Sequence, residues 1–384
     1  MRIAAVNTLP FHRWILADTV AALRADGHDV LDLDHVPQHA HDWAAHNQNL
    51  LVSLGIYGPA AVLLADYPYE PFRRAAGAPV VATRHSLAAR GNTWAAEQGG
   101  ANYLASFGPW DRALLKEHGM GWPALALDTG CAWAGPLLTG VRDCRACWRC
   151  VPEYPGMRVC STCGNKRCPH ATDHFLACSG SNEPGQAGSC YGGGGSSAHR
   201  GVPGRKPVIA WCPTWNDWSP YIAVELAALQ PEMQIVFRPH YATAWRHPEV
   251  LDRARALGFT IDDPLQHPAA LLLQADVLVG DVSGIVLLAL AVPDAALPIV
   301  QVDLPASLTG AQIERWGPEW TNRDDIGVTT APHDVAATVR SVLERDAWQE
   351  SRRVVRRHLF GVEPLPGGLT PGQRLAKEMA CRIG

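Results

Sequence analysis

The sequence predicts an α/β protein of two doubly wound domains with a metal-binding module inserted between them. Its 384 residues exceed the usual size of one domain, about 100–200 residues. Short apolar stretches typical of buried strands alternate with helical patterns in both halves of the chain. Eight of the 11 cysteines fall between residues 144 and 190. We therefore expect an N-terminal domain at 1–140, an insert with a Gly/Ser linker at 141–200, and a C-terminal domain at 201–384.

The N-terminal segment begins with a β-α-β unit. Arg2–Asn7 is an apolar stretch with strand character, and Phe11–Asp26 carries apolar side chains at helical spacing. Gly27 ends that helix before a second strand at Asp29–Leu33. Two strands joined through a helix favour a parallel sheet. The other elements expected in this domain are strands at Ala60–Ala65, Pro79–Thr83 and Trp122–Leu127 and a helix at Trp110–His118.

The segment after Pro207 shows the same alternation and predicts a second parallel sheet. Strands are expected at Val208–Trp211, Gln234–Arg238, Phe259–Ile261, Val277–Gly280 and Ile299–Val302. Helices are expected at Ile222–Leu229, Pro248–Leu257, His267–Gln274, Ile285–Ala291, Val335–Glu344, Ala347–Leu359 and Pro371–Ile383.

The composition excludes some classes of protein. A net charge of −4 argues against a basic surface spread over the whole molecule. The basic residues gather instead in residues 141–206, where nine face only four acidic ones. No apolar run reaches the ~18–20 residues that span a bilayer, and the N-terminus lacks a signal-peptide pattern. We expect a cytoplasmic protein without a membrane span.

The clustered cysteines predict a metal module. Pairs separated by two residues, Cys147/Cys150 and Cys160/Cys163, have the spacing of zinc knuckles. The spacing leaves the partition of ligands and the choice between one and two zinc ions open. Because ligands are in excess, we expect structural rather than catalytic zinc. The candidate ligands are Cys147, Cys150, Cys160, Cys163, Cys168, His170, His174 and Cys178.

The insert also resembles a known group of proteins. The stretch from Cys163-Gly-Asn-Lys-Arg-Cys168 through His174 and Cys178 is similar to small zinc proteins common in bacteriophage genomes. This resemblance covers about 147–191. It implies a phage or prophage source, and hence the cytoplasm of an infected host cell.

Polar residues follow three predicted strands of the C-terminal domain. Thr214 ends the first strand, Arg238 and His240 end the second, and the turn Asp281–Gly284 follows a third. Open α/β sheets bind ligands at the carboxyl ends of their strands. Ser283 and Gly284 would begin a helix, whose free amides favour phosphate. Asp281 alone would be explained equally well as a cap of that helix.

These strand ends resemble the CDP-glycerol glycerophosphotransferase family, which has the GT-B fold. The matching segments are Cys212-Pro-Thr-Trp215, Arg238-Pro-His240-Tyr241, Asp281-Val-Ser283-Gly284 and the closing segment at 367–374. The resemblance implies a GT-B-like fold and contacts of His240 and Ser283 with a donor diphosphate. It also implies a catalytic base, for which His85 in Thr83-Arg84-His85-Ser86 is the nearest match.

The predicted activity is transfer from a UDP- or CDP-linked donor to a hydroxyl group. His85 would activate the acceptor, and Arg238, His240 and Ser283 would stabilise the departing nucleotide. The phage-like insert and its positive charge favour a hydroxylated base in phage DNA as the acceptor. One alternative is a glycerophosphotransferase that uses CDP-glycerol or a CDP-polyol on a cell-surface polymer. Another is a nucleic-acid-binding zinc adaptor on a transferase fold without activity.

Overall fold

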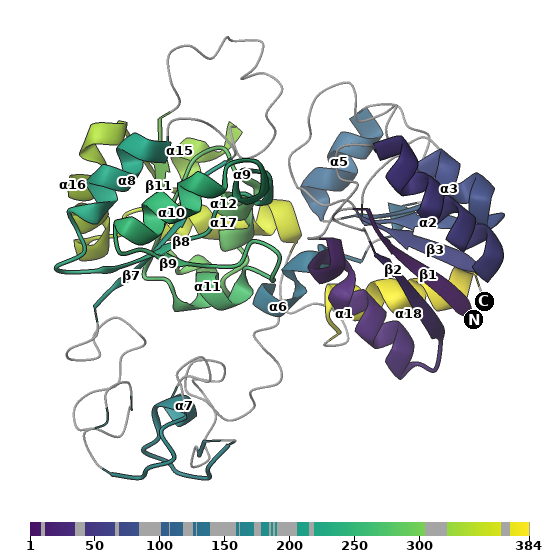
Figure 1. Cartoon of the computed structure of the whole chain (residues 1–384), viewed down its shortest axis with the longest axis horizontal. Helices are drawn as coiled ribbons and strands as arrows, with labels where there is room; N and C mark the ends of the chain where they lie inside the picture. Colours follow the sequence, from purple (N-terminus) through teal and green to yellow (C-terminus); the bar gives the residue numbers. More distant parts are fainter. Residues whose placement is uncertain are drawn as a thin grey trace.

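The computed structural model of the chain describes residues 1–8, 12–34, 43–65, 69–83, 101–106, 108–117, 126–127, 129–138, 159–160, 162–172, 178–183, 186, 189, 206–214, 219–303, 321–361 and 369–383. These residues form two six-stranded parallel sheets with helices interleaved along the chain, which is the expected α/β, GT-B-like architecture (Figure 1). Within the same ranges, no helix combines the length and the apolar character needed to cross a bilayer.

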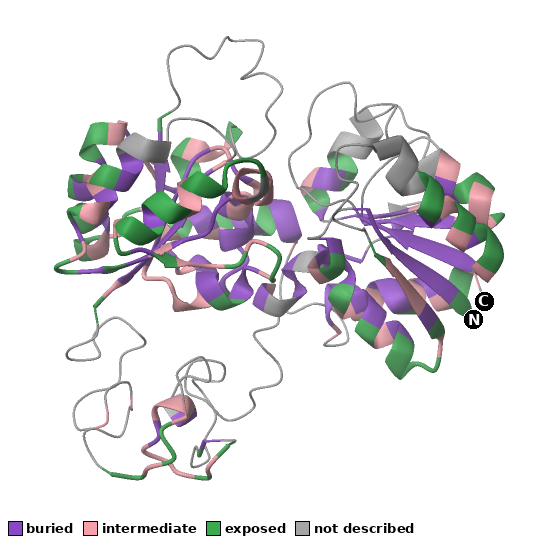
Figure 2. Ribbon diagram, in the orientation of Figure 1, coloured by how far each residue is buried: buried purple, intermediate pink, exposed green. Residues whose placement is uncertain are grey.

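The N-terminal sheet has the strand order β2-β1-β3-β4-β5-β6. Its central strands are buried on both faces, as parallel sheets covered by helices require (Figure 2). One face packs on helices α2 and α3, and the other packs on α1 and α18. The strands are β1 (Arg2–Asn7), β2 (Asp29–Asp34), β3 (Ala61–Leu64), β4 (Val80–Ala82), β5 (Tyr103–Ala105) and β6 (Ala126–Leu127). The helices are α1 (His12–Ala25), α2 (Trp43–Tyr57), α3 (Tyr69–Ala76), α5 (Pro109–Glu117) and α6 (Gly135–Leu138).

The C-terminal sheet has the strand order β12-β11-β10-β7-β8-β9. Its strands are β7 (Val208–Cys212), β8 (Gln234–Phe237), β9 (Thr260–Ile261), β10 (Val277–Gly280), β11 (Ile299–Val302) and β12 (Val328–Thr330). Its helices are α8 (Ser219–Ala227), α9 (Tyr241–Arg246), α10 (Pro248–Ala256), α11 (Ala269–Gln274), α12 (Gly284–Ala289), α15 (Arg323–Ile326), α16 (Val335–Glu344) and α17 (Gln349–Phe360). Strands are present at the expected positions, although of the strand expected at Trp122–Leu127 only Ala126–Leu127 is described. The sequence patterns did not predict β5, β12, α2, α3, α6, α9 and α15.

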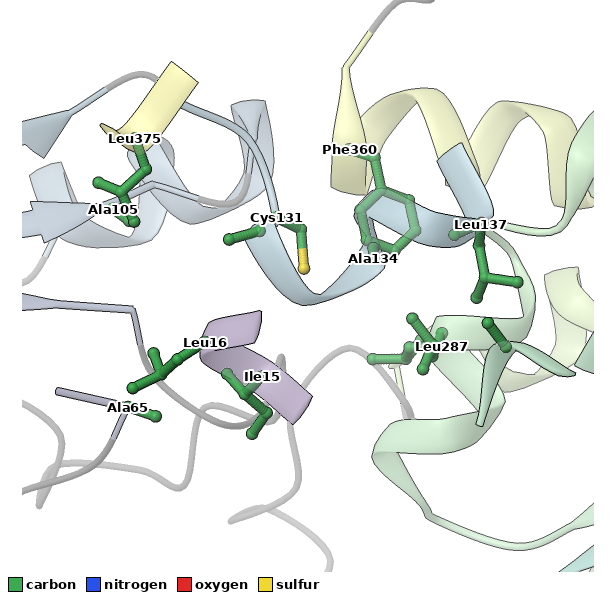
Figure 3. Packing of buried hydrophobic residues seen from close by; sticks show 14 of the residues in the cluster. Ile15, Leu16, Ala65, Ala105, Cys131, Ala134, Leu137, Leu287, Phe360 and Leu375 are labelled. Atoms are coloured by element: carbon green, nitrogen blue, oxygen red, sulfur yellow. The ribbon is translucent and has the colours of Figure 1, made fainter. Parts of the chain in front are cut away.

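One apolar core runs from the first sheet into the second. Leu287 of α12 and Phe360 of α17 belong to the same buried cluster as Ile15 of α1 and Leu137 of α6 (Figure 3). Burying apolar area is favourable by roughly 25 cal/mol per Å², so this shared cluster holds the two sheets together. We call the contact between the two domains in this cluster the seam.

Helix α18 (Pro371–Ile383) returns to the N-terminal domain and packs on α1. A reciprocal capping box starts it: Thr370 N–H donates to Gln373 Oε1 at 2.9 Å, and Gln373 N–H donates to Thr370 Oγ1 at 3.0 Å. The carboxylate of Asp18 accepts from the Gly372 amide at 3.2 Å. Helix α18 thus lies within the segment 201–384 expected to form the C-terminal domain but packs on the N-terminal sheet.

We predict that Gly372→Ala destabilises the protein. A Cβ at this position would lie 2.5 Å from Asp18 Oδ2 and 2.8 Å from the Thr19 amide nitrogen, so α18 must move away from α1. Overpacking of this kind costs about 1–3 kcal/mol, measurable as the free energy of unfolding in denaturant.

Gly55→Ala is the matched control. Its Cβ would lie 3.6 Å from the nearest atom, a carbonyl oxygen of Ala75, which is an ordinary contact. In a helix, alanine is favoured over glycine by roughly 1 kcal/mol, so this variant keeps or gains stability. An equal loss in both variants would contradict the role given to the α1–α18 contact.

Candidate functional site

The strand order of the C-terminal sheet reverses between β7 and β10, and these two strand ends are tied together. Asp281, after β10, is 3% exposed and accepts from Thr214, after β7. The Thr214 amide lies 3.1 Å from both carboxylate oxygens, and Thr214 Oγ1 donates to Oδ2 at 2.9 Å. Such a reversal is where open α/β sheets bind ligands. Asp281 thus shapes the reversal point instead of capping the next helix.

Ser283 caps helix α12 beside this point. Its hydroxyl accepts from the Ile285 amide at 3.3 Å, and the residue is 8% exposed. Gly284 is the first residue of α12. Gly280 ends β10 without a side chain, because a Cβ there would lie 2.8 Å from Val286 Cγ2. The turn therefore brings the Ser283 hydroxyl close to the carboxyl edge of the sheet.

His240 follows the adjacent strand β8 and caps helix α9. Its Nδ1 accepts from the Ala242 amide at 3.2 Å, so in the neutral ring Nε2 carries the proton. The ring also packs at 4.7 Å on that of Tyr241. These contacts fix His240 as a hydrogen-bond donor through Nε2, which is a form that can recognise phosphate oxygens.

Arg238, which directly follows β8, holds the loop after β9. Its side chain is 3% exposed, and its guanidinium donates to the Asp262 carboxylate and to the carbonyl oxygens of Asp263, Pro264 and Gln266. Both terminal nitrogens are thus used to hold the loop after β9. Arg238 is therefore a structural anchor of this edge.

The N-terminal side of the site is described in part. The predicted base His85 lies outside the described residues, although Thr83 just before it is buried at the end of β4. A histidine that the sequence patterns did not single out, His12, lies at the start of α1 with its Nδ1 3.1 Å from Thr8 Oγ1. Because His12 is fully buried, it packs within this edge.

His267 is a second histidine that sequence reasoning missed. It precedes α11 on the loop that Arg238 holds, and its Nδ1 accepts from the Ala269 amide at 2.9 Å. Its ring makes an edge contact at 4.9 Å with Trp14 of α1, in the other domain. The signal was present in the sequence, because His267-Pro-Ala repeats the spacing of His240-Tyr-Ala.

Four cysteines of the insert come together around one point. The sulphur atoms of Cys160, Cys163, Cys168 and Cys178 all lie within 4.8 Å of one another and could hold a metal ion such as zinc. The Cys160–Cys178 and Cys168–Cys178 sulphur distances are 3.7 and 3.9 Å. A tetrahedron of thiolates about 2.3 Å from a zinc ion has edges of about 3.8 Å. The spacing therefore fits a closed tetrahedral site.

The backbone of the insert is shaped around these sulphurs. Gly164, with φ +72°, lets the chain turn after Cys163, and the Cys160 amide donates to the Asn165 carbonyl at 3.1 Å. Amides of Thr162 and Ser179 lie 3.4 Å from the sulphurs of Cys160 and Cys168. Figure 1 shows this part of the chain, with helix α7 (Pro169–Thr172), apart from both sheets.

Among the residues that the structure describes, the group contains four of the eight candidate ligands. The knuckle Cys160/Cys163 pairs with Cys168 and Cys178. His170 lies in α7 outside the group of four, and its backbone makes a hydrogen bond to the Cys168 sulphur. The other candidate ligands, Cys147, Cys150 and His174, lie outside the described residues.

The pKa values of Cys168 and Cys178 are shifted in opposite directions. Burial acts to raise the pKa of Cys168, but hydrogen bonds from Ser179 and from the His170 backbone outweigh it and lower this pKa to about 6. For Cys178, the Gly180 backbone lowers the pKa, whereas the side chain of Cys163, burial and the other two sulphurs together raise it to about 12. A cation at the centre of the group would stabilise all four sulphurs as thiolates.

The comparisons with known proteins support the fold alone. No protein-family model matches the sequence, and no curated protein matches it. Among solved structures, the wall teichoic acid polymerase TagF has a TM-score of 0.60 at 12% identity, covering 100% of this chain and 89% of that one. A TagF variant soaked with CDPG gives 0.60 at 13% identity, covering 100% and 88%. UDP-GlcNAc 2-epimerase from Neisseria meningitidis, bound to UDP-GlcNAc, gives 0.55 at 12% identity, covering 100% of both chains.

We predict that the purified protein carries a metal ion that Cys168→Ser removes. Losing one of four sulphur ligands opens the tetrahedron, so elemental analysis after gel filtration should give well under half of the wild-type metal content. Cys381→Ser is the control, because Cys381 is an exposed cysteine of α18 outside the group. Equal metal content in both variants would contradict the assigned site.

Proposed function

We propose that the protein is a nucleotide-donor transferase that moves a sugar or related group to a hydroxyl acceptor. The observation that carries this proposal is the reversal point of the C-terminal sheet, where the Thr214–Asp281 tie lies beside His240 and Ser283. All four are at carboxyl ends of strands, where this fold class binds ligands. The similarity to TagF and to the epimerase supports a nucleotide-linked donor, since those structures carry CDPG and UDP-GlcNAc.

The reaction assigns separate work to the two sheets. The C-terminal edge holds the donor, with Nε2–H of His240 and the hydroxyl of Ser283 directed to phosphate oxygens as negative charge develops there. His85 takes the proton of the acceptor hydroxyl as its oxygen forms the new bond. The bond between the transferred group and the nucleotide phosphate breaks, and the nucleotide leaves with that electron pair. Asp281 and Thr214 keep the edge in shape.

The acceptor that we propose is a hydroxylated base in DNA. Support comes from the insert, whose sequence resembles phage zinc proteins and where basic residues outnumber acidic ones. We propose that the four cysteines hold one structural zinc ion that folds this module. The module would then contact the acceptor, while the chemistry takes place between the sheets.

We predict a mass shift in modified nucleosides. The protein is incubated with hydroxymethylated DNA and a panel of UDP- and CDP-linked donors, and the DNA is digested to nucleosides for mass spectrometry. His240→Ala should lower product formation by about 100-fold or more, the usual effect of losing one donor to a developing charge. His358→Ala, an exposed histidine of α17, should react like the wild type. No shift with any donor would rule out a DNA acceptor.

The similarity to TagF favours one other acceptor, a polyol phosphate of a cell-surface polymer. In that reaction the acceptor oxygen would attack phosphorus and release CMP. Release of CMP with a glycerophosphate acceptor, and none with DNA, would establish this alternative. A protein that binds nucleic acid but consumes no donor in either assay would be a zinc adaptor on an inactive fold.

A further inference from the structure

We propose that His267 is a second donor-binding histidine and that Arg238 is the residue that positions it. His267 would donate a hydrogen bond from Nε2 to an acceptor oxygen of the nucleotide. This inference rests on the proposed function, because it adds a ligand contact to the same carboxyl edge. It also gives Arg238 a defined task in place of the direct phosphate contact expected from the sequence.

Arg238 holds the loop that leads to His267. Arg238 follows β8, two residues before His240, and its buried guanidinium has four acceptors. They are the Asp262 carboxylate and three backbone carbonyls, the last of them at Gln266. A backbone carbonyl held on each of three residues leaves the loop little freedom just before His267. The position of His267 therefore depends on the same strand end that carries His240.

The rings of His240 and His267 make the same hydrogen bond through Nδ1. In each, Nδ1 accepts an amide hydrogen from the alanine two residues later, at 3.2 Å for His240 and 2.9 Å for His267. An Nδ1 that accepts a hydrogen places the proton of the neutral ring on Nε2. Two neighbouring strand ends, those of β8 and β9, thus each lead to a histidine prepared as an Nε2–H donor.

His267 also contacts the N-terminal domain through Trp14. Trp14 of α1 meets the His267 ring edge-on, with ring centres 4.9 Å apart and an interplanar angle of 75°. Because α1 begins at the carboxyl end of β1, this contact lies where the carboxyl edges of the two sheets face one another. His267 is half-buried there, so its ring is oriented from one domain and attached to the other.

The chemistry that fits is an oxygen acceptor on a nucleotide. An imidazole N–H can donate to a diphosphate oxygen or to a carbonyl of a pyrimidine base, and the two share the same recognition. The binding assay can separate them, because inorganic pyrophosphate offers only the first acceptor and cytidine or uridine only the second.

The test is isothermal titration calorimetry with CDP, UDP, pyrophosphate, cytidine and uridine. We expect His267→Ala to weaken binding of CDP or UDP by about tenfold or more, as for loss of a hydrogen bond to a charged or buried partner. His267→Gln, whose side-chain amide can occupy the place of Nε2–H, should restore affinity to within about threefold of the wild type. A matching loss for pyrophosphate assigns the contact to phosphate, and a loss for the nucleosides assigns it to the base.

His247→Ala is the matched control. His247 also precedes a proline at the start of a helix, but it is exposed and its Nδ1 faces Glu249 at 3.3 Å. The His247→Ala variant should bind CDP and UDP with the affinity of the wild type. If the wild type binds and His240→Ala loses affinity while His267→Ala does not, the present inference is wrong and the proposed function stands. If the wild type binds neither CDP nor UDP, the proposed function falls, and this inference with it.

The positioning role of Arg238 is tested by a double-mutant cycle. Arg238→Met should weaken nucleotide binding about as much as His267→Ala, and the double variant should lose little more than either single variant. Additive losses would show that Arg238 acts independently of His267. Circular dichroism of Arg238→Met, compared with wild type, verifies that the sheet remains folded.

Discussion

The architecture depends on the attachment of α18 to α1. The last helix of the chain leaves the C-terminal sheet and begins, with its capping box at Thr370 and Gln373, against the Asp18 carboxylate. Glycines at 135 and 372 leave room for that carboxylate, since a Cβ at either would lie within 3 Å of it. The N-terminal sheet therefore completes its covering layer only when residues 371–383 have been made. Both domains are linked by this return as well as by the seam.

In the proposed function, the carboxyl edge of the C-terminal sheet has both a structural role and a binding role. Asp281 and Arg238 are charged, yet both are buried. Asp281 makes hydrogen bonds to the neighbouring strand end at Thr214, and Arg238 makes them to the loop after β9. The neutral donors beside them, His240 and Ser283, sit at helix starts. In the proposed function, the charged residues hold this edge rigid and the polar groups of His240 and Ser283 contact the donor. Rigid support of this sort limits the entropy lost on binding.

Some of these features follow from local sequence and others do not. The strand ends at Thr214 and Ser283 were predictable because apolar strands and helix starts have local signals. The task of Arg238 was not, because its partners lie 24–28 residues further along the chain. Likewise, spacing identified the Cys160/Cys163 knuckle but not its pairing with Cys168 and Cys178. Helix α2, apolar along much of its length, carries too little periodicity to mark one buried face.

Helix α12 connects the carboxyl edge of the C-terminal sheet to the seam over a very short distance. Ser283 caps it, and Leu287, one turn later, lies in the apolar core shared by the two domains. Six residues of helix span only about 9 Å and move as one rigid piece. A ligand that reduces the mobility of the first turn of α12 therefore reduces the mobility of the seam as well. If a ligand binds at this edge, amide hydrogen exchange should become slower in α6 and α17 as well, because both helices share the core that contains Leu287.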